Sequence, residues 1–106
     1  MQGFWTVKFN GVQGWGAGTI TMVAGKVFGG DSSYLYTGTY NQNGDHLSAR
    51  VHVKQFNGAL SNVMGRAEFD LELSGTKANP NIINATGKIP GTQLQLGATL
   101  AKQSDI

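Results

Sequence analysis

Apolar and polar residues alternate along much of this chain, which is the period of a β-strand with one buried face. In the first such segment, Trp5, Val7 and Phe9 fall on one side, and Thr6 and Lys8 fall on the other. The same pattern, interrupted by short segments rich in Gly, Pro, Asn or Ser, recurs to the end of the chain. It predicts eight strands: Phe4–Asn10, Trp15–Val23, Lys26–Phe28, Ser33–Gln42, Asp45–Phe56, Val63–Ser74, Ile82–Ile89 and Gln93–Lys102.

The order and spacing of these strands indicate the fold. Short turns join consecutive strands as antiparallel neighbours, and closure of such a sheet removes its exposed edges. We therefore predict an all-β fold, an eight-stranded antiparallel up-and-down, lipocalin-like β-barrel, with a two-sheet sandwich as the alternative. No linker, repeat or low-complexity segment divides the 106 residues, so residues 1–106 are expected to form a single domain.

A turn signal between two of these strands predicts which residues lie opposite each other. Asn43-Gly44 is the preferred dipeptide of a two-residue type I′ hairpin turn. The turn predicts four opposing pairs: Tyr40 with Leu47, Gly38 with Ala49, Tyr36 with Val51, and Tyr34 with Val53. This register places all three tyrosines on the apolar, inward face of the sheet.

Before the tyrosine strand, Gly29-Gly30-Asp31 is expected to form a corner. Asp31 can accept a hydrogen bond from the backbone amide of Ser33, as in an Asx turn, and this structural role is favoured over that of a buried acid.

The inward tyrosines are the one feature that the barrel itself does not require. Buried phenols need hydrogen-bond partners, so they either bond within a filled core or line a cavity that holds a small molecule. An eight-stranded barrel is wide enough for either arrangement. The pattern favours a filled core, and the candidates for a ligand cavity are Tyr34, Tyr36, Tyr40 and Asp31.

Charge on the outer faces is expected to be structural. The alternation predicts that an acidic row faces a basic row across two neighbouring strands, with Glu68, Asp70 and Glu72 near Arg50, His52 and Lys54. Exposed cross-strand pairs of this kind contribute a few tenths of a kcal/mol each.

Composition narrows the function. Eight Lys and Arg residues against six Asp and Glu give a net charge of +2, and the cations are scattered, so no direct nucleic-acid binding is expected. No apolar run approaches the roughly 20 residues of a membrane span, and no signal peptide is evident. We therefore expect a cytoplasmic protein that does not associate with membranes.

Several kinds of chemistry lack the residues they need. The chain has no cysteine, and His46 and His52 would lie roughly 20 Å apart along one strand, too far to share a metal ion. Gly14-Trp15-Gly16-Ala17-Gly18 precedes β-branched residues rather than a helix, which favours a bend in the barrel over a phosphate loop. With no catalytic set evident, we expect no enzyme activity, no metal and no cofactor.

Short glycine and aromatic motifs in this chain resemble those of the GrlR-type family, small bacterial proteins named after a negative regulator of type III secretion. The motifs are Gly3-Phe4-Trp5, the pattern GGDxxYxYxGxY over residues 29–40, the segment from Phe69 to Gly75, and Gly87. The resemblance implies a lipocalin-like barrel that dimerises. It also implies a non-catalytic regulator that binds a transcriptional activator and holds it inactive.

One turn differs from the pattern of that family, in which an acidic run after the tyrosine strand is thought to engage the activator. The corresponding positions here are Gln42, Asn43, Gly44 and Asp45, and only Asp45 is acidic. We therefore do not expect this turn to bind the same activator in the way that the family's acidic turn is thought to do. Two functions remain as expectations, a protein-binding regulator that forms a homodimer and a carrier or sensor of a small apolar molecule held inside the barrel.

Overall fold

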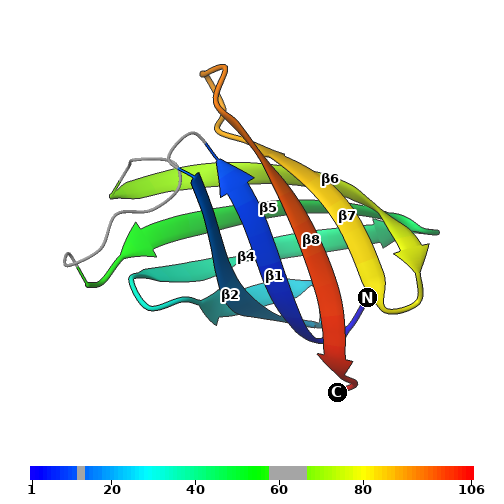
Figure 1. Ribbon diagram of the computed structural model, residues 1–106. Coiled ribbons are helices and arrows are strands. Elements are labelled where there is room, and N and C mark those ends of the chain that lie inside the picture. Colours follow the sequence, from blue (N-terminus) through cyan, green and yellow to red (C-terminus); the bar gives the residue numbers. More distant parts are fainter. Residues whose placement is uncertain (12–13, 58–66) are drawn as a thin grey trace.

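The computed structural model describes residues 1–11, 14–57 and 67–106. These residues form eight strands and no helix: β1 (Gly3–Gly11), β2 (Gly14–Val23), β3 (Lys26–Gly30), β4 (Tyr34–Asn43), β5 (His46–Gln55), β6 (Glu68–Asn79), β7 (Ile82–Lys88) and β8 (Gln95–Ser104). Each strand pairs antiparallel with the next, and β1 also pairs with β8, so the sheet closes into an up-and-down barrel (Figure 1). The predicted barrel is confirmed, and the sandwich alternative is wrong.

The predicted inner faces form the core of the barrel. In β1, Trp5 and Val7 are buried, and in β8 the buried side chains are those of Leu96, Ala98 and Leu100. The largest side chains that are almost completely buried come from six different strands: Trp5, Met22, Val27, Leu47, Ile83 and Leu100. Strand alternation therefore suffices to sort the residues between the interior and the solvent.

The barrel has two different ends. One end, which we call the termini end, carries both chain termini together with the β2–β3, β4–β5 and β6–β7 turns (Figure 1). Here the indole N–H of Trp5 donates to the carbonyl oxygen of Met1 at 3.0 Å, and Lys102 Nζ lies 5.8 Å from the Trp5 ring centroid. The other end, which we call the Asp31 end, carries the β3–β4 and β7–β8 connections.

The register of β4 and β5 differs from the predicted one by two residues. Tyr36 lies opposite Val53 rather than Val51, and Tyr40 lies opposite Ala49 rather than Leu47. The turn residues are Gly44 and Asp45, and of these Gly44 alone has a positive φ, at 62°. A positive φ at the first central position only is typical of a type II′ turn, so the type I′ prediction is wrong. A shift of two residues leaves every side chain on its predicted face.

The ends of β3 and β6 also differ from prediction. Gly29 and Gly30 continue β3 instead of forming the corner, because both pair with β2 and β4. Strand β6 extends through Asn79, where the polar composition had indicated a strand end at Ser74, because its polar residues alternate outward while it pairs with β7. The beginning of the predicted Val63–Ser74 strand lies outside the described residues.

The predicted charge row lies on the outer surface of β5 and β6. The register pairs Arg50 with Glu72, His52 with Asp70, and Lys54 with Glu68. The Arg50 and Glu72 side chains form an ion pair, and His52 lies between Asp70 Oδ1, at 2.8 Å, and Glu68 Oε2, at 2.6 Å. The hydrogen bonds to Asp70 and then to Glu68 raise the pKa of His52 above its usual value. These groups are exposed, so their contribution to stability is small.

Gly38 lies where β4 and β5 approach each other so closely that only glycine fits. A Cβ atom there would overlap the carbonyl oxygen of Arg50 on β5, and the carbonyl is backbone, which cannot move without disturbing the sheet. Gly29 meets the same constraint against the backbone of Thr19 on β2. The strands β2 to β5 can therefore bend around the barrel only if these positions carry no side chain.

This close approach predicts a large effect of one added methyl group. We expect Gly38→Ala to lower the free energy of unfolding by about 2 kcal/mol or more, as measured by equilibrium denaturation with guanidinium chloride. Gly97→Ala on β8 is the matched control, because a Cβ there would meet no atom within 4 Å, and we expect a change of less than about 0.5 kcal/mol. Equal effects of the two substitutions would contradict the steric account.

Candidate functional site

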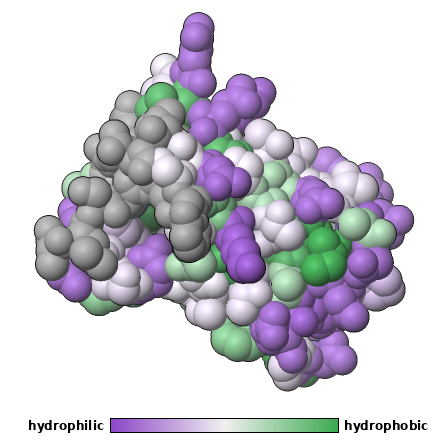
Figure 2. Space-filling model, in the orientation of Figure 1, coloured by the Kyte–Doolittle hydropathy of each residue, from purple (hydrophilic) through white to green (hydrophobic). Residues whose placement is uncertain are grey.

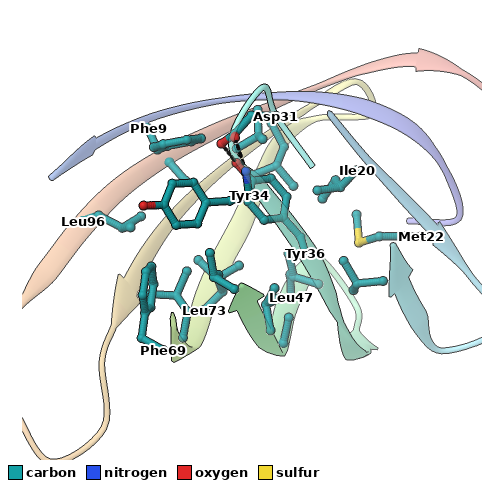
Figure 3. A pocket seen from close by; sticks show the side chains of 18 residues that line it. Phe9, Ile20, Met22, Asp31, Tyr34, Tyr36, Leu47, Phe69, Leu73 and Leu96 are labelled. Carbon is teal, nitrogen blue, oxygen red and sulfur yellow. Dashed lines mark hydrogen bonds between the residues drawn. The ribbon is translucent and has the colours of Figure 1, made fainter. Parts of the chain in front are cut away.

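The interior of the barrel is not completely filled. A cavity lies among side chains from every strand except β7. Its volume is about 80 Å³, counted as the space that the centre of a water-sized sphere can occupy. One water molecule needs roughly 10–15 Å³ on this measure, so the space exceeds that of a single solvent molecule. Its described lining is apolar apart from Asp31 and two tyrosine hydroxyls, and the labelled apolar side chains in Figure 3 are Phe9, Ile20, Met22, Leu47, Phe69, Leu73 and Leu96.

The β3–β4 connection places Asp31 at the wall of this cavity. Asp31 Oδ1 accepts hydrogen bonds from the backbone amides of Ser33 and Tyr34, both at 2.8 Å. The Asp31 amide donates in turn to the carbonyl oxygen of Tyr34 at 3.0 Å, which closes a tight corner. The predicted Asx turn is therefore confirmed, and it leaves Oδ2 directed toward the interior, where it accepts from the hydroxyl of Tyr36 (Figure 3).

Tyr36 is held by this carboxylate and by a gap in the neighbouring strand. Only 8% of the residue is exposed, and a Cβ on Gly18 of β2 would lie 3.0 Å from the Tyr36 hydroxyl oxygen. Glycine at position 18 therefore makes room for the phenol. Residues 14–23 form strand β2, as the bend interpretation of the glycine-rich segment predicts, and no helix follows that could bind a phosphate.

Burial is the main reason why the pKa of Tyr36 is raised well above its usual value. The hydrogen bond to Asp31 and the negative charge of that carboxylate raise it further, because ionisation would place two anions side by side. Tyr36 therefore stays a neutral hydrogen-bond donor over the whole physiological pH range.

Tyr34 occupies the next inward position of β4 but has a different environment. The residue is 3% exposed, and its hydroxyl has no hydrogen-bond partner in the part of the chain that the structure describes. Figure 3 shows this hydroxyl pointing away from Asp31, toward the side of the cavity where Leu96 and Phe9 lie.

The remaining predicted site residues lie elsewhere. Tyr40 is on the inner face and packs against the core, but it does not line the cavity. The turn candidates, Gln42, Asn43, Gly44 and Asp45, are exposed at the termini end, roughly 30 Å along β4 from Tyr34. The structure thus brings Asp31, Tyr34 and Tyr36 together and separates them from the turn candidates.

Several lining residues were predicted to face inward but not to border a cavity. Phe9, Phe69 and Leu96 all occupy inner positions of the alternating pattern. Alternation predicts which face of a strand a residue lies on. Whether a cavity remains depends on how the side chains of seven strands pack together, and no pattern in the sequence indicates this. The sequence also did not indicate that Ser33, next to the Asp31 corner, is a buried polar residue. Its hydroxyl has no hydrogen-bond partner among the described residues.

Metal binding finds no support in the described residues. They contain no group of three or more His, Asp or Glu side chains arranged to hold an ion. His52 is occupied by Asp70 and Glu68, and His46 Nε2 lies 3.3 Å from the hydroxyl of Ser74.

No protein family model matches this chain, and no curated protein matches its sequence. The likeness to the GrlR-type family therefore stays a prediction, while the eight-stranded barrel of lipocalin-like size stands on the structure alone. Within residues 1–11, 14–57 and 67–106, no helix is long and apolar enough to cross a membrane.

The environment of Tyr36 predicts how stability changes at alkaline pH. The phenol ionises near pH 10 in the unfolded chain but keeps its proton in the folded one, so the unfolded state binds fewer protons above that pH. The contribution of Tyr36 to the free energy of unfolding is fully present below about pH 10. It is lost as the pH rises further, by up to roughly 1.4 kcal/mol per pH unit.

Urea unfolding of the wild type and Tyr36→Phe between pH 8 and pH 11 measures this difference. We expect the variant to be less stable at pH 8, by about 1–3 kcal/mol, because Asp31 loses a buried donor. Above pH 10 the gap between the two proteins should narrow. A gap that is the same at every pH would show that Tyr36 ionises normally in the folded protein.

Proposed function

We propose that this protein is a non-catalytic binding protein that holds one small, mainly apolar molecule inside its barrel, as a carrier or sensor. The observation that carries the proposal is the cavity, which is bordered almost entirely by apolar side chains and retains unfilled space. An apolar molecule placed there would leave water and gain contacts with the lining. This burial is favourable by about 25 cal/mol for each Å² of apolar surface.

The polar groups at the cavity support binding rather than catalysis. Both oxygens of Asp31 already accept hydrogen bonds, and the Tyr36 hydroxyl is committed to that carboxylate. Among the described lining residues there is no histidine, lysine or cysteine that could act as a base or nucleophile beside them.

Toluene is a suitable first probe, because it is small, apolar and free of hydrogen-bonding groups. At ten times its dissociation constant, a ligand that binds only the folded state raises the free energy of unfolding by about 1.4 kcal/mol. We expect the thermal midpoint of the wild type to rise with toluene concentration, as followed by circular dichroism.

Two leucine substitutions on the same strand test whether toluene binds in the cavity. Ala98→Leu places a larger side chain in the space and should abolish the toluene effect, whereas Ala101→Leu, on the outer face of β8, should preserve it. Absence of a toluene effect in the wild type, or an equal effect in both variants, would overturn the proposal.

A second candidate function is the protein-binding regulator implied by the family resemblance, acting as a homodimer. Its support is an apolar strip on the outer surface, where Phe4, Phe28 and Leu35 are 39%, 48% and 47% exposed. The register places Phe4 and Phe28 on either side of Thr21, and Leu35 is diagonal to Phe28 across β3 and β4.

The strip suits a second copy of the same chain because its own residues are uncharged. In a dimer with a two-fold axis, the strip of one copy would pack against the strip of the other. This would remove apolar surface from water, and no two like charges would meet, because Phe4, Phe28 and Leu35 are uncharged. The face of the molecule seen in Figure 2 shows small hydrophobic areas separated by hydrophilic residues.

Sedimentation velocity over a range of protein concentrations tests the dimer. We expect the wild type to move toward the mass of two chains as concentration rises, and Phe28→Ser to remain at the mass of one. Lys88→Ser, on β7 across the barrel from β3, is the control and should behave like the wild type. A wild type that stays monomeric throughout would contradict this candidate.

A further inference from the structure

The cavity contains one polar group whose hydrogen-bonding capacity is unused. Tyr34 as a residue is only 3% exposed, and its hydroxyl has no partner in the described part of the chain. The hydroxyl oxygen keeps a little accessible surface, because the one fully buried side-chain polar atom without a partner among the described residues is Ser33 Oγ. Buried phenols usually have a partner, because burial removes the hydrogen bonds that water would otherwise provide. The hydroxyl projects into the cavity, so a molecule held there could supply the missing partner (Figure 3).

The neighbouring polar groups already have hydrogen-bond partners within the protein. The Tyr36 hydroxyl donates to Asp31 Oδ2, and Asp31 Oδ1 accepts two backbone amides. The described lining includes no Lys, Arg or His, and its one carboxylate is that of Asp31. A bound anion would therefore be buried close to a carboxylate with no cation to balance it, which is unfavourable.

We propose that the Tyr34 hydroxyl is the polar anchor of the cavity and that it selects an uncharged molecule with a small apolar body and one hydrogen-bonding group. Alcohols, phenols and ketones of about the size of a single ring have this chemistry. The hydrogen-bonding group meets Tyr34, and the apolar body contacts the rest of the lining. This inference rests on the proposed function, because it assumes that the cavity binds a ligand.

A pair of probes that differ by one hydroxyl tests the anchor. Toluene and p-cresol have the same ring and methyl group, and only p-cresol can bond to Tyr34. We expect Tyr34→Phe to weaken p-cresol binding about fivefold to tenfold, the effect of one lost hydrogen bond, and to change toluene binding less than twofold. Titration followed by NMR chemical shifts gives both dissociation constants.

Two controls keep the comparison interpretable. Tyr40→Phe removes a hydroxyl from the same strand and the same face, but outside the cavity, and should leave both probes unaffected. Tyr34→Phe should fold as stably as the wild type, because the hydroxyl that it removes has no partner among the described residues. The anion p-toluate, at neutral pH, should bind at least tenfold more weakly than p-cresol.

The outcomes separate the two proposals. If neither toluene nor p-cresol binds the wild type, the proposed function fails and the anchor fails with it. If toluene binds but Tyr34→Phe leaves p-cresol unchanged, or weakens both probes equally, the cavity stands and the anchor alone is overturned. Binding of p-toluate as tight as that of p-cresol would overturn the selection for uncharged molecules.

Discussion

The hydrogen-bonded seam between β1 and β8 is the constraint on which the rest of this structure depends. Residues Phe4–Asn10 pair with residues 97–104, and this pairing turns a meander of hairpins into a closed surface with an inside. Without the seam, the apolar faces of both strands would lie at open edges. Closure also demands strong bending, and Gly29 and Gly38 permit it by letting backbones approach more closely than any side chain allows. The cavity is thus a product of closure and bending together.

Asp31 links the backbone of this barrel to its interior. One carboxylate oxygen shapes the corner by accepting two amides, and the other holds the phenol of Tyr36. A single side chain therefore determines both how β4 begins and which of two adjacent inward tyrosines has a partner. Both tyrosines face inward, and they differ in where their hydroxyls lie. Tyr36 lies within reach of the corner, whereas the hydroxyl of Tyr34 points away from it (Figure 3).

The fold could be predicted from the sequence because its determinants are local and periodic. Alternation assigned Trp5, Leu47 and Ile83 to the interior, and all three are almost completely buried. The β4–β5 register could not be predicted as well, since either Asn43-Gly44 or Gly44-Asp45 can serve as the two central turn residues, and the structure has Gly44-Asp45. The Asx turn at Asp31 was foreseeable, because an Asp side chain reaches the amide two residues on.

The site was only partly accessible to sequence reasoning. The tyrosine strand and Asp31 were identified as candidates, yet nothing in the pattern distinguishes Tyr34 from Tyr36 or excludes Tyr40 from the cavity. These differences arise from how side chains of distant strands pack, which depends on three-dimensional fit rather than on residue type.

From its long range in sequence, we expect the β1–β8 seam to form late during folding. Every other strand pair joins neighbours in the chain, whereas this one joins residues about a hundred positions apart, as with Phe4 and Ser104. Contacts of such long range are slow to form, because the loop between them must be closed first. On the ribosome, seven strands can pair in turn as they emerge, but the ring cannot shut until β8 has been released. Until then the nascent sheet has two unprotected edges and an uncovered apolar face, which is the period in which this chain is most exposed to aggregation.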